Sequence, residues 1–472
     1  MQKNAGKTVK IKPGTKFTLC SPDDLGSLDY TTSVILLNAY SSYDRGLLRS
    51  ALRPSIRKNK LLPREIDAYN LCIHEYTHYL DLHCTVWGME FVSRRCRALS
   101  RILEQGKEAL SVTMLNTAEI LMHKDFEKVH QKLKLERVVT KHAITYSKKY
   151  GAVIVVYLYR DGALIAETSV SMLSILEANA VANEFEGEYH WVGCTLGEVT
   201  PHQDGRIEAK YTQLLQDSSR LEYNIIHILV AIHFPAHTLR HRLRLVSVLC
   251  QLALDMYALD LSMLANLIND AIKNKYFGDA LCNDLCRGMS RQIVTFYLVL
   301  WLHGYIQHAK LTVDEVAKYI DGPLDELIDD MLEAVGLEHP LSRNMSDFEF
   351  RVYYNTLKKE PGKFILPGAL KAAAHNRRVR KSQLATSRAF RKLMLPDIVL
   401  DDHAKIRPLS RIKASVLSHW DNMYEECSEL DGMAGDPDVM KKFHMSPDDF
   451  GPMQQRRQIH MQKGMQEELD EY

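Results

Sequence analysis

The stretch from Leu71 to Leu82 constrains the fold of this chain more than any other. It contains no Gly or Pro, and apolar and aromatic residues recur on every side of the predicted helix. The polar residues His74, Glu75 and His78 stand within this apolar setting. Because a helix that is hydrophobic nearly all round is buried, the sequence predicts an interior helix that carries two imidazoles and one carboxylate.

The spacing of these three side chains suits a metal site. Residues four apart lie one turn apart on the same helix face, so His74 and His78 can present two ring nitrogens to one ion. Glu75 lies just beside that face, where it can act as a general base without being a ligand. His83 lies about 140° round the helix from His78. We therefore exclude His83 as a third ligand.

A third ligand is expected in the stretch 172–185, whose apolar residues recur at helical spacing around Glu177. Burying an unpaired carboxylate is costly, so Glu177 requires a metal or a cation unless it lies at the helix edge near solvent. Glu184 continues the same stripe but stands near Gly187, where we expect the helix to end, so we predict that Glu184 is exposed. Asp81 either orients one imidazole through its second ring nitrogen or lies at the surface.

These two motifs resemble a known family. The pattern His74-Glu-x-x-His78, followed by Glu177-Ala-Asn-x-x-Ala-x-Glu184, is similar to the zincin metallopeptidases of the ImmA/IrrE type. The resemblance covers residues 30–190. The two motifs lie farther apart in this chain than in the small members of that family.

The resemblance implies a gluzincin-like ligand set and a reaction. His74, His78 and Glu177 would bind Zn²⁺, and Glu75 would be the catalytic base. Val181 stands where the family usually has Phe. The implied activity is hydrolysis of peptide bonds in a protein substrate.

Composition places the chain among globular proteins. It has 472 residues, of which 46% are hydrophobic, and a net charge of +1. No charge excess indicates a nucleic acid or a membrane as partner, and no apolar run is long enough to span a bilayer. The first residues lack the apolar segment of a signal peptide, and nine scattered cysteines fit reduced thiols. We therefore expect a cytoplasmic protein.

The pattern of elements predicts an α+β fold that is predominantly α-helical. Residues 1–200 are expected to form a small zincin-like domain with a short β-sheet and a helical insertion at about 90–140. Helical-bundle regions are expected at 206–310 and 311–426, followed by an acidic, partly disordered tail at 427–472. Strands are expected at Lys16–Cys20, Ser33–Tyr40, Ala152–Arg160 and Ala163–Val170.

Two further needs of a peptidase guide the choice of other site residues. The hairpin expected at 152–170 would lie beside the metal and offer a strand edge to an extended peptide. The oxyanion of the tetrahedral intermediate needs a hydrogen-bond donor, and we assign Tyr157, Tyr159 and His190 as candidates for that role.

Three functions are compatible with these features. The favoured one is a zinc endopeptidase that acts on one or few intracellular protein targets in a bacterium or phage, regulated by its helical C-terminal region. The second is a non-enzymatic helical module, with structural or lost zinc, that binds a partner or nucleic acid through the basic segment Arg377–Lys392. The third is a di-iron carboxylate protein, because Glu75-x-x-His78 and Glu127-x-x-His130 are two Glu-x-x-His pairs.

Overall fold

The computed structural model describes most of the chain between residues 25 and 414. The described residues are 25–29, 33–53, 62–101, 122–147, 151–337, 343–359, 367–379, 392–402, 404–406 and 412–414. They form many helices and three small sheets, which confirms the predicted α+β, predominantly α-helical class. The strand predicted at Lys16–Cys20 and the tail predicted at 427–472 lie outside the described residues.

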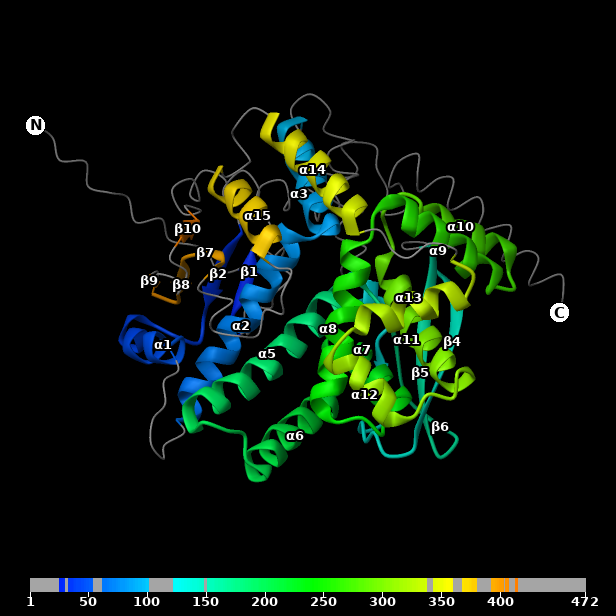
Figure 1. Ribbon diagram of the computed structural model, residues 1–472, viewed down its shortest axis with the longest axis horizontal. Helices are drawn as coiled ribbons and strands as arrows, with labels where there is room; N and C mark the ends of the chain where they lie inside the picture. The colour runs from blue at the N-terminus through cyan, green and yellow to red at the C-terminus, as the bar shows by residue number, and fades with distance from the viewer. Residues whose placement is uncertain are drawn as a thin grey trace, which may run out of the picture.

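Two long helices form the centre of the molecule. The helix α2 (Pro63–Cys84) has Pro63 in its first turn, where the missing N–H leaves no hydrogen bond unmade. The helix α5 (Met172–Leu196) begins after the N-cap Ser171, whose hydroxyl accepts a hydrogen bond from the Ser174 amide. The two helices pack side by side, although a long stretch of sequence separates them (Figure 1).

The predicted end of α5 at Gly187 is wrong. Gly187 lies where α5 meets α2, and a Cβ at this position would come within 3.2 Å of Tyr69 Cε1 and 3.4 Å of Ile73 Cγ1. The glycine therefore lets the two helices approach closely, and their packing offsets its low helix propensity. The helix ends instead before Gly197, whose φ is +91°. Glu184 consequently lies well inside a helix.

A four-stranded sheet beside α2 joins distant parts of the chain. Its order is β1-β2-β8-β9, and β2 runs parallel to β8. The strands are β1 (Ser27–Asp29), β2 (Val34–Leu37), β8 (Ile398–Leu400) and β9 (Lys405–Ile406). The observed β2 falls within the predicted strand Ser33–Tyr40. The strands β8 and β9 complete the sheet of the N-terminal region, although they lie within 311–426, where we expected a helical region.

A second four-stranded sheet is antiparallel and has the order β3-β6-β5-β4. Its strands are β3 (Lys128–Val129), β4 (Val138–Ser147), β5 (Gly151–Arg160) and β6 (Ala163–Ser169). The predicted hairpin is confirmed, because Asp161 and Gly162, with φ of +50° and +82°, make the tight turn between β5 and β6. The free strand edge that we predicted for this hairpin is only partly present, because β4 covers the outer side of β5 and β3 pairs with Ala166 and Glu167 of β6.

The helical insertion predicted at about 90–140 is only partly correct. The helix α3 (Val86–Arg101) lies at its start, and residues 102–121 lie outside the described residues. A short 3₁₀ helix, η2 (Met122–Asp125), then leads into β3 and β4. Residues from Val138 onward form a strand because they are rich in β-branched side chains and pair with β5 along the whole of β4.

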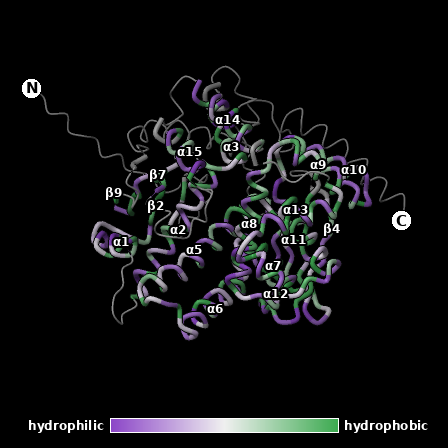
Figure 2. The backbone as a smooth tube through the Cα atoms, viewed as in Figure 1, coloured by the Kyte–Doolittle hydropathy of each residue, from purple (hydrophilic) through white to green (hydrophobic). Residues whose placement is uncertain are grey.

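A group of helices follows α5 and shares its hydrophobic core. These helices are α6 (Pro201–Leu215), α7 (Leu221–His233), α8 (Leu239–Asp255), α9 (Ala258–Asp270), α10 (Lys275–Leu285), α11 (Arg291–His308), α12 (Val313–Asp321) and α13 (Leu324–Ala334). Buried residues of α7, α8 and α11 belong to the same core cluster as those of α2 and α5. Figure 2 shows hydrophobic and hydrophilic stretches alternating along most of these helices, as expected for amphipathic helices around a common core.

The side chain of the basic residue Arg377 forms ion pairs within the protein. Its guanidinium lies 2.6 Å from Asp255 Oδ1 and 2.8 Å from Asp347 Oδ1, and it donates to the Cys84 carbonyl at the end of α2. These contacts join α15 (Pro367–Val379) to α2, α8 and α14 (Arg343–Lys359). Residues 380–391 lie outside the described residues, so partner binding by the rest of the basic segment stays a prediction.

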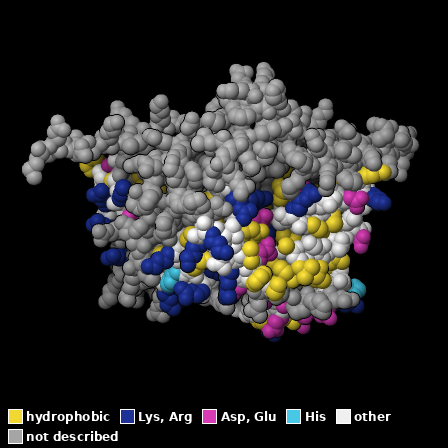
Figure 3. All heavy atoms as spheres, turned by 90° about the horizontal axis from the view of Figure 1, so that it is seen from above, with side chains coloured by type: hydrophobic (Ala, Val, Ile, Leu, Met, Phe, Trp, Pro, Cys, Tyr) yellow, Lys and Arg dark blue, Asp and Glu magenta, His cyan; other side chains and the backbone are white. Residues whose placement is uncertain are grey.

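The surface charges and the helix lengths concern the predictions about nucleic acid and membrane partners. In the coloured part of the face drawn in Figure 3, Lys and Arg side chains are most frequent on the left, and hydrophobic side chains on the right. Within the described residues, no single helix has the length and apolar composition needed to cross a membrane. The helices α8 and α9 meet that requirement only as a pair, bent by 111°.

The remaining described elements are η1 (Ser42–Asp44), α1 (Arg45–Ala51), β7 (Met394–Pro396) and β10 (Ile412–Ala414).

Candidate metal centre

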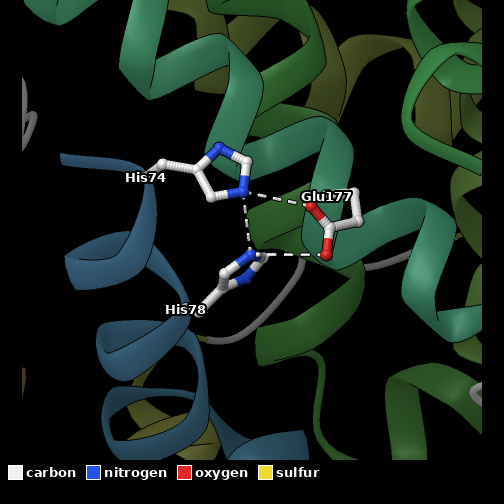
Figure 4. A group of neighbouring side chains, drawn as sticks. All are labelled: His74, His78 and Glu177. Carbon is white, nitrogen blue, oxygen red and sulfur yellow. Dashed lines mark hydrogen bonds and ion pairs between the residues drawn. The ribbon is translucent and has the colours of Figure 1, made fainter. Parts of the chain in front are cut away.

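His74, His78 and Glu177, here called the triad, meet where α2 packs against α5 (Figure 4). His74 Nε2 lies 3.1 Å from His78 Nε2 and 3.1 Å from Glu177 Oε2, and His78 Nε2 lies 3.5 Å from Glu177 Oε1. In a tetrahedral zinc site with bonds of about 2.0–2.1 Å, ligand atoms lie roughly 3.3 Å apart. The observed separations bracket that value, so the triad fits a zinc ion.

The triad is buried, and its charges are coupled. Burial lowers the pKa of His74, but hydrogen bonds with Glu177 and Glu184 outweigh it and hold this pKa well above its ordinary value. Burial raises the pKa of Glu177, yet the charge of His78 and hydrogen bonds with both histidines bring it down to about 2. Without a metal, both shifts favour a protonated His74 beside an ionised Glu177. A metal ion would bind in exchange for that proton, as is usual for histidine ligands.

Glu184 is a site residue that the sequence analysis predicted wrongly as exposed. Its side chain is 22% exposed, and its Oε2 lies 3.3 Å from His74 Nδ1, the ring nitrogen that does not face Glu177. A carboxylate at the second nitrogen of a metal-binding histidine fixes the tautomer and the orientation of the ring. Glu184 thus occupies the place that was considered for Asp81. The sequence feature that could have identified Glu184 as a site residue is its position on the same apolar helix stripe as Glu177.

Asp81 is fully buried, so the surface alternative is wrong. It accepts a hydrogen bond of 2.8 Å from Asn179 Nδ2, which links α2 to α5. Asn179 Oδ1 in turn accepts hydrogen bonds from Ser247 of α8 at 2.9 Å and from Asn183 at 3.1 Å. The two asparagines of the second motif therefore hold three helices together, a role that the sequence analysis missed.

The substitution Asn179→Ala is expected to destabilise the protein by about 1–3 kcal/mol, because the buried Asp81 carboxylate loses a hydrogen-bond donor. The measurement is the midpoint of urea unfolding. The matched control is Asn355→Ala, the same change at an exposed position of α14. Equal midpoints for the two variants would contradict the role assigned to Asn179.

Glu75 lies against the segment that leads into β1. It is 3% exposed, and a Cβ placed on Gly26 would lie 3.0 Å from its Oε1. The same Cβ would lie 3.0 Å from Leu37 Cδ2 and from Leu71 Cδ1. Position 26 therefore has room for glycine alone unless these neighbours move. The sequence contains no pattern that reveals this close approach.

Substituting Gly26→Ala is expected to displace the Glu75 carboxylate and to cost about 1–3 kcal/mol of stability through overpacking. The midpoint of urea unfolding measures this loss. Gly46→Ala in α1 is the control, since a Cβ there meets no atom within 4 Å. A Gly26→Ala variant as stable as this control would contradict the crowding argument.

The three residues assigned as oxyanion donors do not lie with the triad. Tyr157 packs in a separate apolar cluster with Val155 and Phe126, and Tyr159 lies under Lys141, whose Nζ is 5.2 Å from the ring centroid. His190 lies 13 residues beyond Glu177 in α5. At about 1.5 Å per residue, it is roughly 20 Å farther along the helix. His190 is therefore too far along α5 for the oxyanion role, whereas Tyr157 and Tyr159 have the other neighbours described above.

Tyr223 of α7 is an aromatic residue at the triad that the sequence analysis missed. Its ring stacks on His74, with 6.3 Å between the ring centroids and 25° between the ring planes. The Arg220 guanidinium lies 5.6 Å from the centroid of the Tyr223 ring. No spacing rule connects α7 to α2, so only the tertiary structure brings this hydroxyl-bearing ring to the site.

Two other histidines bear on the rejected alternatives. His83 Nε2 lies 2.7 Å from Ser33 Oγ, away from the triad, which agrees with its exclusion as a ligand. His130 and Glu127 flank the strand β3, so they do not share a helix face as the di-iron interpretation requires. His130 Nε2 instead lies 3.4 Å from Glu167.

Comparisons of the chain with protein-family models, with curated proteins and with solved structures found no match. The resemblance to ImmA/IrrE-type zincins therefore rests on the two sequence motifs alone. A function for this site has to be inferred from its own chemistry.

Proposed function

We propose that this protein is a zinc endopeptidase acting on a protein substrate. The observation that carries the proposal is the convergence of His74, His78 and Glu177 on one point, at separations of 3.1–3.5 Å. Structural zinc sites use four protein ligands, whereas catalytic sites use three and keep one position for water or substrate. Two histidines and one glutamate are a ligand set of the catalytic kind.

The chain's own residues divide the work of hydrolysis. A bound Zn²⁺ would polarise the scissile carbonyl and lower the pKa of water. Glu75, next to His74 in α2, accepts a proton from the attacking water and returns it to the leaving amine. Glu184 holds the His74 ring through Nδ1, and the link between Asp81 and Asn179 keeps α2 and α5 in place. These contacts therefore keep the ligands in position while Glu75 gains and loses its proton.

The strand β1 is the proposed docking edge for the substrate. It stands at one end of the described order β1-β2-β8-β9, and Gly26, just before it, lies against the Glu75 carboxylate. An extended peptide that adds to β1 by main-chain hydrogen bonds would bring its peptide bonds beside Glu75. This edge takes the place of the hairpin at 152–170, whose strands are paired within their own sheet.

Tyr223 is the proposed donor to the oxyanion. Tyr223→Phe is expected to lower kcat about 10²-fold, the usual effect of losing one such donor, while zinc content and stacking on His74 remain. The measurement is kcat at saturating substrate, with Tyr305→Phe in α11 as the matched control. Unchanged kcat in Tyr223→Phe would rule out this role.

The helices beyond residue 200 contribute to the site itself. Tyr223 of α7 stacks on His74, and Ser247 of α8 donates to Asn179. We therefore propose that the C-terminal region regulates the peptidase through the position of α7 and α8. A fragment ending near residue 205 would expose the buried faces of α5, so this proposal has to be tested in the full chain.

The proposed activity is tested by incubating the full chain with a proteome-derived peptide library and identifying new termini by mass spectrometry. Cleavage that disappears with a chelator and returns with added zinc is the expected result. No cleavage by the zinc-loaded protein, or cleavage that a chelator does not affect, would contradict the proposal.

A further inference from the structure

A second group of side chains that could hold a metal ion lies outside the triad. His123, Glu127 and Glu222 each place one nitrogen or oxygen within 4.8 Å of the other two. They come from η2, from the turn that follows it and from the first turn of α7. We propose that these three residues bind a second divalent transition-metal ion, separate from the one at the triad.

The histidine of this second group is held as metal-binding histidines are. His123 is 2% exposed, and its Nδ1 lies 3.1 Å from the hydroxyl of Ser171, the N-cap of α5. A histidine that binds a metal with one ring nitrogen usually has its other nitrogen fixed by a hydrogen bond, and Ser171 supplies that contact. The imidazole is therefore buried and oriented before any ion binds.

The charges of the second group favour a divalent cation. Two half-buried carboxylates that lie within 4.8 Å of each other repel. A divalent ion balances both carboxylates. One imidazole with two carboxylates suits Zn²⁺, Mn²⁺ or Fe²⁺ better than Ca²⁺ or Mg²⁺, which prefer oxygen ligands alone.

An ion at this place would tie the antiparallel sheet to the helices of the triad. Glu127 immediately precedes β3, whereas Glu222 precedes Tyr223, the residue that stacks on His74. Ser171, which contacts His123, caps the helix that carries Glu177. The ion would therefore fix α7 relative to α5. The second site is formed by its own three residues and does not require peptidase activity.

The test is the metal content of the full chain after saturation with Zn²⁺ or Mn²⁺ and gel filtration, measured by inductively coupled plasma mass spectrometry. Wild type is expected to hold two equivalents. The double variant Glu127→Gln/Glu222→Gln should hold one, because glutamine keeps the size of each side chain but removes both charges. Glu136→Gln, an exposed glutamate in the same segment, is the control and should hold two.

A triad variant separates this inference from the proposed function. His74→Ala/His78→Ala should lose one equivalent and keep the second, and its remaining ion should still raise the melting temperature. An ion kept by the triad variant and lost from Glu127→Gln/Glu222→Gln supports the second site even if the protein hydrolyses nothing. Equal metal content in wild type and Glu127→Gln/Glu222→Gln would overturn the inference, with His123 then forming only ion pairs with the two carboxylates.

Discussion

The double substitution His74→Ala/His78→Ala is expected to abolish hydrolysis and to remove the zinc of the triad. Both imidazoles face the same point beside Glu177, and a single carboxylate does not retain zinc at neutral pH. The variant should also lose the stabilisation that bound zinc supplies, about 2.7 kcal/mol when zinc exceeds its Kd a hundredfold. Metal analysis, the peptide assay and thermal unfolding with and without zinc measure the three effects.

His83→Ala is the matched control for this experiment. His83 lies on the same buried helix but contacts Ser33, so its loss should leave zinc binding and hydrolysis intact. Full zinc content at the triad in His74→Ala/His78→Ala, or loss of zinc in His83→Ala, would contradict the ligand assignment.

The substitution Glu75→Gln is expected to lower kcat by about 10²–10⁴-fold, the usual contribution of a general base. Zinc should remain, because Glu75 is adjacent to the triad and is not one of its members. Glutamine has nearly the same size, so the close contact with Gly26 is preserved. The measurements are kcat and zinc content on the same sample.

Glu65→Gln serves as the control, since Glu65 is also buried in α2 but accepts a hydrogen bond from Ser50 at 2.7 Å. Its kcat should stay near that of wild type. Undiminished hydrolysis by Glu75→Gln would show that another group takes the proton, and the proposed mechanism would then be wrong.

The two helices of the triad could be predicted because their signals are local. His74 and His78 are four residues apart in a helix of apolar neighbours, and Glu177 lies on an apolar stripe where a carboxylate is costly. The structure brings these three residues together. Capping residues and the turn at Asp161 and Gly162 are also local, and the hairpin prediction succeeded for the same reason.

The errors arise where tertiary contacts decide what a residue does. In the sequence, Gly187 resembles a glycine that ends a helix. In the structure, a glycine suits this position because Tyr69 and Ile73 of α2 approach it closely. That misreading also placed Glu184 at a helix end, away from His74. Tyr157 has the right chemistry for an oxyanion donor, yet the strand pairing that fixes its direction is not visible in the sequence.

Long-range pairing was the least predictable part of the fold. The strand β2 pairs with β8 through Ile35 and Ile398, and neither short strand carries a signal that names its partner. Tyr223 reaches His74 only because α7 packs on α5. Periodicity predicts which face of an element is buried, but it does not predict which other element buries that face.

The central claim, that zinc is bound by His74, His78 and Glu177, is tested most directly by anomalous diffraction at the zinc edge from crystals of the full chain. We predict an anomalous peak about 2.0–2.1 Å from Nε2 of each histidine and about 2.0–2.2 Å from a carboxylate oxygen of Glu177. A zinc site completed by Asp81, His83 or Glu184 in place of Glu177, or no peak at the triad in zinc-saturated crystals, would contradict the account.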